Sequence, residues 1–182
     1  MKMRTAGNVI GSPYLRMTLA ALCLALAYVL PFLTGQIPTV GKMLCPMHLP
    51  VLLCGFLCGP VWGLVVGAIA PLLRSLTLGA PPLFPMAISM SLELLTYGAM
   101  AGILYRVFPP KRLYVVVSLV LAMLSGRAVW GVAMAILMNV ASRPFGWSAF
   151  LTGAFVEAVP GILIQLLLIP TVVILITRRV SR

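Results

Sequence analysis

The sequence predicts an all-α membrane protein, a single integral domain (residues 1–182) built as a bundle of six transmembrane helices. Hydrophobic residues make up 62% of the chain and charged residues 8%, and the mean hydropathy is +1.15. These values exclude a soluble globular domain. Apolar runs of spanning length recur between segments rich in Gly, Pro and basic residues. The 182 residues leave room for about six spans of ~20 residues with short loops.

The first helix is expected over residues 14–33. It follows a basic start with Lys2 and Arg4, which could also be the n-region of a signal peptide with a cleavage site at Ala25-Leu26-Ala27. The apolar run continues past that site to Leu33, which is a spanning length. A retained first helix is therefore favoured.

The second and third helices, expected over residues 47–58 and 61–78, are separated by a Gly59-Pro60 break. The second is too short to cross ~30 Å of hydrocarbon at ~1.5 Å per residue. The third carries Arg74 near its far end, where a charge costs several kcal/mol unless it is paired or hydrated. Irregular backbone and charge at membrane depth are tolerated around a protein-lined cavity. This stretch is therefore predicted to form one wall of a binding site.

The remaining helices are expected over residues 84–107, 113–141 and 147–176. The fourth is closed by Pro109-Pro110-Lys111-Arg112, a strong loop signal. Pro160 and Pro170 are expected to kink the sixth helix.

The basic residues set the orientation. Six crossings place both termini on one side, and nine of the thirteen basic residues then lie on that side: Lys2, Arg4, Arg16, Arg106, Lys111, Arg112, Arg178, Arg179 and Arg182. Lys42 and Arg143 lie on the other side, while Arg74 and Arg127 lie within spans. The positive-inside rule then predicts that both termini are cytoplasmic. It also explains the net charge of +11 without nucleic acid as a partner.

Polar residues gather in the outer half of the predicted bundle, and intramembrane ionisable groups usually mark functional sites. The candidate ligand-binding residues are Arg74, Glu93, Arg127, Glu157, His48, Trp130, Asn139 and Tyr97. The alternative interpretation is that two ion pairs, Arg74 with Glu93 and Arg127 with Glu157, hold the bundle together. Both interpretations can apply, because a pair that lines a cavity can still bind a polar ligand.

The cysteines are expected to be structural. Cys23, Cys54 and Cys58 fall within spans and are interpreted as small buried hydrophobic residues, whereas Cys45 is placed near the outer surface. An alternative is a metal site at Cys45, Met47 and His48, a soft ligand set that suits Cu(I), or nickel with more nitrogen ligands. No cofactor is expected. The chain has no HExxH, nucleophile elbow or phosphate loop, so it is not expected to be an enzyme.

A family resemblance follows from the order of several features. These are the basic start, six helices in under two hundred residues, Ala21-x-x-x-Ala25 on the first helix, and the turn Gly55-Phe56-Leu57-Cys58-Gly59-Pro60 followed by Gly63 and Gly67. Together they resemble the substrate-binding S-component of an energy-coupling factor (ECF) transporter. Met47-His48-Leu49-Pro50 resembles the start of the nickel and cobalt members, but here it is internal.

The resemblance implies a binder of a vitamin or related micronutrient in a bacterial plasma membrane, which docks on a coupling subunit driven by two ATPases. It also implies that the first loop, the loop between helices three and four, and the outer halves of helices four to six enclose the ligand.

The small residues Ala21, Ala25 and Ala27 would let another helix approach closely, so helix one is the expected docking face. Packing within the bundle is the alternative for these alanines.

The alternative function is a self-sufficient channel, a small exporter or a membrane scaffold. The mix of charges with Trp130 suits a polar or zwitterionic heterocycle, so thiamine, pyridoxine, riboflavin and pantothenate all remain open.

Overall fold

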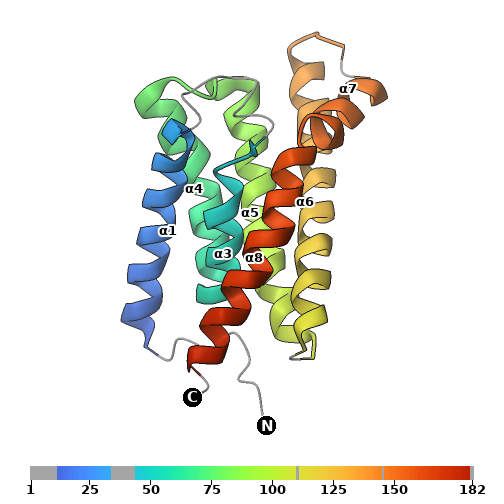
Figure 1. Cartoon of the computed structure of the whole chain (residues 1–182). Coiled ribbons are helices and arrows are strands. Elements are labelled where there is room, and N and C mark those ends of the chain that lie inside the picture. The colour runs from blue at the N-terminus through green and yellow to red at the C-terminus, as the bar shows by residue number, and fades with distance from the viewer. Residues whose placement is uncertain (1–11, 34–43, 110, 145, 181–182) are drawn as a thin grey trace.

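The described part of the chain is helical throughout. The computed structural model describes residues 12–33, 44–109, 111–144 and 146–180. The predictions for Lys2, Arg4, Lys42 and Arg182 lie outside the described residues, as do the side chains of Arg178 and Arg179. The helices form one bundle, in which α1 begins and α8 ends at the same end (Figure 1).

The helices follow the predicted order closely. Their bounds are α1 Pro13–Leu33, α3 His48–Cys58, α4 Pro60–Leu78, η2 Leu83–Ala87, α5 Ile88–Val107, α6 Arg112–Val140, α7 Trp147–Leu151, η3 Thr152–Val156 and α8 Val159–Val180. Five of the described helical segments are long and apolar enough to cross a membrane: 13–32, 60–78, 83–107, 112–140 and 159–177. With 11 residues, α3 is too short, as expected. Six full spans are therefore not confirmed.

Two predicted helices are interrupted near a proline. The predicted fourth helix (84–107) corresponds to η2 and α5 together, but its start is irregular: Phe84 has extended backbone angles (φ −112°, ψ 132°), and α-helix begins at Ile88. Proline disfavours helical geometry in the residue before it, here Phe84 before Pro85.

The predicted sixth helix is also not one kinked rod. The N–H of Glu157 donates to the Thr152 carbonyl (2.9 Å), five residues back, and a turn then separates η3 from α8. Pro160, which has no N–H, lies in the first turn of α8, where none is needed.

Close backbone approach joins the central helices. Gly63 of α4 faces Gly98 of α5 so closely that a Cβ at Gly98 would collide with the Gly63 carbonyl. The main core around this contact draws side chains from α1, α3, α4, α5, α6 and α8. A satellite cluster of Trp130, Met134 and Ala154 packs with Met138, Phe150 and Phe155.

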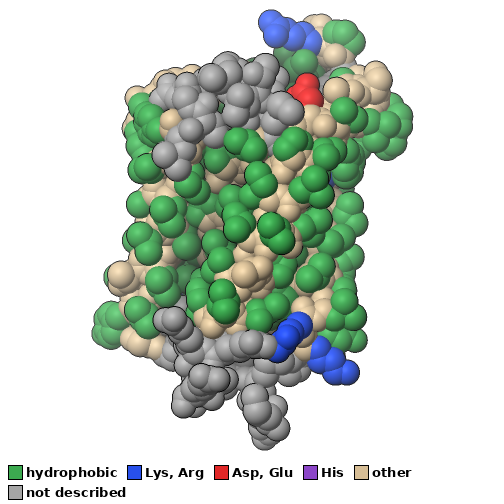
Figure 2. All heavy atoms as spheres, in the orientation of Figure 1, with side chains coloured by type: hydrophobic (Ala, Val, Ile, Leu, Met, Phe, Trp, Pro, Cys, Tyr) green, Lys and Arg blue, Asp and Glu red, His purple; other side chains and the backbone are tan. Residues whose placement is uncertain are grey.

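The outside of the bundle suits lipid. Figure 2 shows a face covered mainly by hydrophobic side chains along its length, with Lys and Arg side chains at its two ends. Many large apolar side chains are exposed, among them Leu22 of α1, Val61 of α4 and Leu167 of α8. This distribution is the one expected for helices solvated by hydrocarbon.

Candidate ligand-binding site

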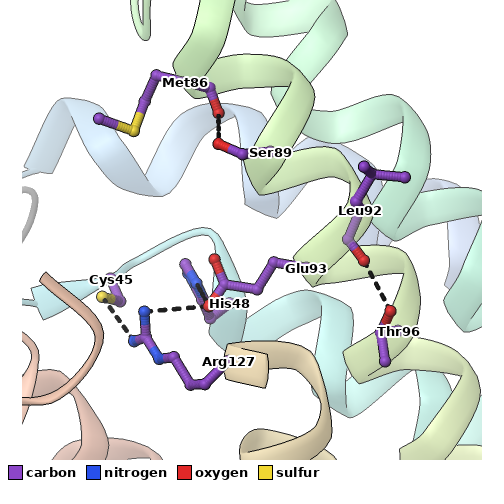
Figure 3. Close-up of polar contacts among 8 residues, drawn as sticks. All are labelled: Cys45, His48, Met86, Ser89, Leu92, Glu93, Thr96 and Arg127. Atoms are coloured by element: carbon purple, nitrogen blue, oxygen red, sulfur yellow. Dashed lines mark hydrogen bonds and ion pairs between the residues drawn. The ribbon is translucent and has the colours of Figure 1, made fainter. Parts of the chain in front are cut away.

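A buried charged cluster lies where α3, α5 and α6 meet. Glu93 of α5 is 1% exposed, and its Oε1 lies 3.0 Å from Nη1 of Arg127, on α6. Nε2 of His48, the first residue of α3, lies 3.6 Å from the same oxygen. Figure 3 shows these side chains and Cys45 pointing toward one another. We call Glu93, Arg127, His48 and Tyr97, described next, the polar cluster.

Tyr97 completes the polar cluster. It lies one helical turn after Glu93 on the same face of α5 and is fully buried. Its ring meets the His48 ring edge-on, with centroids 5.4 Å apart, and packs so closely on Gly126 that a Cβ there would collide with it. Its hydroxyl lies beside the Glu93 carboxylate.

The short helix α3 explains how a histidine reaches this depth. Eleven residues give a helix about 17 Å long, roughly half of a membrane crossing. Because α3 ends at the Gly59 turn, where α4 begins, its N-terminal end lies among the other helices (Figure 1), and His48 there is buried. The N-terminus of a helix carries partial positive charge, which favours the nearby carboxylate of Glu93.

Cys45 adjoins the cluster and is buried, at 8% exposure. Its predicted position near the outer surface of the membrane stays a prediction. Its Sγ accepts a long hydrogen bond from Nη2 of Arg127 (3.8 Å). Burial raises the pKa of the Cys45 thiol, and the nearby Arg127 guanidinium only partly opposes this, so the thiol is neutral at pH 7. The other cysteines, Cys23, Cys54 and Cys58, are buried as expected.

Several polar atoms of the cluster have no aligned hydrogen-bond partner. They are both ring nitrogens of His48, Oε1 of Glu93, the hydroxyl of Tyr97 and Nε of Arg127. Buried polar atoms are nearly always paired in folded proteins. A group of five such atoms in one place is therefore a natural place for a polar ligand.

The two predicted ion pairs are wrong. Arg74 is buried between α1 and α4, where its Nη1 donates to the Tyr28 carbonyl (2.8 Å) and its guanidinium lies 4.9 Å from the Phe32 ring centroid. Arg127 pairs with Glu93 instead. Within the described residues, Glu157 makes no ion pair.

The comparison with known families decides the identity. The family model for the substrate-specific component of ECF transporters matches residues 15–173. The chain belongs to this family. No curated protein and no solved structure matches it significantly.

In this S-component, two other candidate residues lie apart from the polar cluster. Trp130 belongs to the satellite cluster and stacks on Phe150 at a centroid distance of 6.3 Å. Asn139 is exposed and lines an open hollow of ≈ 470 Å³ with Arg143 at the end of α6. Of the eight residues that the sequence predicted, the polar cluster thus unites four.

The alternative metal site gains little support. Met47 packs in the main core, and Cys45 lies beside a guanidinium rather than in a set of ligands. Across the described residues, no group of three or more His, Cys, Asp or Glu could hold a metal ion.

The first helix of the S-component separates its alanines into two faces. Ala21 and Ala25 are exposed, whereas Ala20 and Ala27 are buried in the core. Ala27 is therefore part of the internal packing, the alternative that the sequence left open. Only Ala21 and Ala25 remain available to a partner helix.

Sequence reasoning missed Gln165. This α8 residue is 1% exposed, and neither its amide nitrogen nor its amide oxygen has a hydrogen-bond partner. It is the only amide side chain in the apolar run 159–177. That isolation is the signal that could have identified it, because a buried unpaired amide is costly.

Proposed function

We propose that this S-component binds a water-soluble vitamin or a related micronutrient at the polar cluster. It delivers the ligand by docking on a membrane coupling subunit driven by two ATPases, and it performs no catalysis itself. The observation that carries the proposal is the buried Glu93–Arg127 ion pair, with His48 and Tyr97 around it, inside an otherwise apolar bundle. Ionisable side chains inside a membrane protein usually mark a functional site.

The proposed orientation places both termini in the cytoplasm. Arg106 and Arg112, which are exposed, lie at the end of α5 and the start of α6. They join the other basic residues that the sequence assigns to the side of the termini. Ligand then reaches the cluster from outside. The exposed Ala21 and Ala25 of α1 would contact the coupling subunit.

Tyr97→Phe tests the site because it removes only a hydroxyl that has no aligned partner. Affinity for the ligand that co-purifies, identified by mass spectrometry, should fall about three- to tenfold, the worth of a neutral hydrogen bond. The melting temperature should change little, since the hydroxyl makes no aligned hydrogen bond within the protein.

Tyr105→Phe is the matched control for this test. Tyr105 lies two turns further along α5, and its hydroxyl contacts Thr177 at 3.4 Å. Affinity should be unchanged in this variant. Wild-type affinity in Tyr97→Phe would contradict the site, and ligand uptake without any coupling subunit would contradict the transport role.

A further inference from the structure

The ion pair within the polar cluster is electrically balanced. Glu93 and Arg127 form this ion pair, and their charges cancel. The Cys45 thiol beside them is neutral. Within the described residues no other Lys, Arg, Asp or Glu side chain forms an ion pair with Glu93 or Arg127. The Glu93–Arg127 pair therefore presents a ligand with no net charge.

The atoms of the polar cluster without an aligned hydrogen-bond partner include both donors and acceptors. Nε of Arg127 can only donate, the Tyr97 hydroxyl can do either, and Oε1 of Glu93, which already holds the ion pair, can only accept. His48 supplies one donor and one acceptor when neutral. A ligand that complements such a site carries a hydrogen-bond acceptor and a hydrogen-bond donor on neighbouring atoms.

We propose that the ligand of the polar cluster is uncharged at neutral pH and binds through an adjacent acceptor and donor, as in a lactam, a carboxamide or an amino-substituted ring nitrogen. This inference rests on the proposed function. Each charge of the pair is already neutralised by the other. An anionic ligand would therefore bring an uncompensated negative charge close to Glu93, and a cationic ligand would bring an uncompensated positive charge close to Arg127. Burying an unpaired charge costs far more than a hydrogen bond returns.

The first experiment uses probes of three charge classes on the detergent-purified protein. The matched set is nicotinamide (uncharged), nicotinate (anionic) and 1-methylnicotinamide, whose ring nitrogen is methylated (cationic), joined by riboflavin, pantothenate and thiamine. Melting temperature is measured for each, and any co-purified ligand is identified by mass spectrometry. Thermal stabilisation by uncharged probes alone, or an uncharged co-purified ligand, is the expected result.

A charged probe or a charged co-purified ligand that binds at least as well as every uncharged one would overturn the inference and leave the proposed function standing. If no probe binds and nothing co-purifies, both fail. These outcomes separate the two statements, because the first concerns the charge of the ligand and the second its existence.

The second experiment changes the charge of the cluster. Glu93→Gln leaves Arg127 uncompensated, so the preference should shift toward the anionic member of the set, by about tenfold or more relative to the uncharged member. Arg127→Gln should shift the preference toward the cationic member instead. A residue pair with only a structural role would weaken binding of all classes equally, and that result would overturn the inference.

Arg112→Gln is the control for a simple loss of one positive charge. Arg112 is exposed at the start of α6, about four helical turns before Arg127 on the same helix. Its substitution should leave the order of the three charge classes as in the wild type. A shift as large as that of Arg127→Gln would mean that overall charge, not the polar cluster, sets the preference.

Discussion

At the scale of single residues, the Glu93–Arg127 ion pair removes two charges from solvent. Glu93 is 1% and Arg127 6% exposed. The attraction within such a pair often fails to repay the loss of hydration, so buried pairs are poor sources of net stability. Their presence in a bundle with so few charged residues is therefore better explained by binding than by folding.

A double-mutant cycle measures how strongly the two charges depend on each other. Glu93→Gln should lower the free energy of unfolding by about 3–5 kcal/mol, because it strands the Arg127 charge in the bundle. Arg127→Gln should cost a similar amount. The double variant leaves no buried charge and should be more stable than either single one, as measured by unfolding in detergent. Additive losses would show that the residues act independently.

Arg74 shows a different way to hold a charge. It has no carboxylate partner within the described residues and instead uses a backbone carbonyl and an aromatic face from α1. A nearby hydrogen bond between the hydroxyls of Tyr28 and Thr77 (3.1 Å) links the same two helices. Arg74 therefore fastens α1 to α4, since cation–π contacts and charge-assisted hydrogen bonds both add to this packing.

At the scale of elements, the glycines of α4 and α5 decide how close the central helices come. Gly63 and Gly98 bring two backbones into contact without side chains between them. Ser91 adds a hydrogen bond across the same pair of helices, from its hydroxyl to the Ala68 carbonyl (3.1 Å). This tight pair gives α5 a fixed position, which in turn fixes Glu93 and Tyr97.

The exposed face of α1 carries a prediction about docking. Ala25→Phe should leave ligand affinity and melting temperature near the wild-type values, because Ala25 is exposed. It should prevent co-purification with the coupling subunit, because small residues allow the close helix contact that a large ring blocks. Val132→Phe on α6, at a side chain 61% exposed, is the control and should retain the complex. Equal losses of binding and docking would instead place Ala25 in internal packing.

At the scale of the whole molecule, the sequence predicted the helices better than their contacts. Long apolar runs and Gly-Pro breaks located most helix ends within one residue, for example Leu33 of α1 and Leu78 of α4. The faces of those helices were harder to predict. Apolar residues surround a membrane helix on all sides, so no polar stripe indicates which side faces a neighbour.

That lack of periodicity explains the wrong ion pairs. Depth alone placed Arg74 at the level of Glu93, but rotation about α4 turns Arg74 toward α1. The interruption before α8 was missed for a related reason. Pro160 predicted an irregularity in the helix. Its actual place, in the first turn of a new helix, depends on the π-helical turn at Thr152–Val156. The sequence has no clear signal for that turn.

The orientation of the bundle gives the last prediction, which uses the two exposed residues that flank α6, Lys111 and Arg143. In whole cells, a membrane-impermeant maleimide should label Arg143→Cys from outside, and Lys111→Cys only after the membrane is opened, because the basic end should be cytoplasmic. The wild type is the control. Its four cysteines are all buried and should give little background. Labelling of both variants from one side would mean that α6 does not span the membrane. The reverse pattern would mean that the bundle is inverted and that the polar cluster receives its ligand from the cytoplasm.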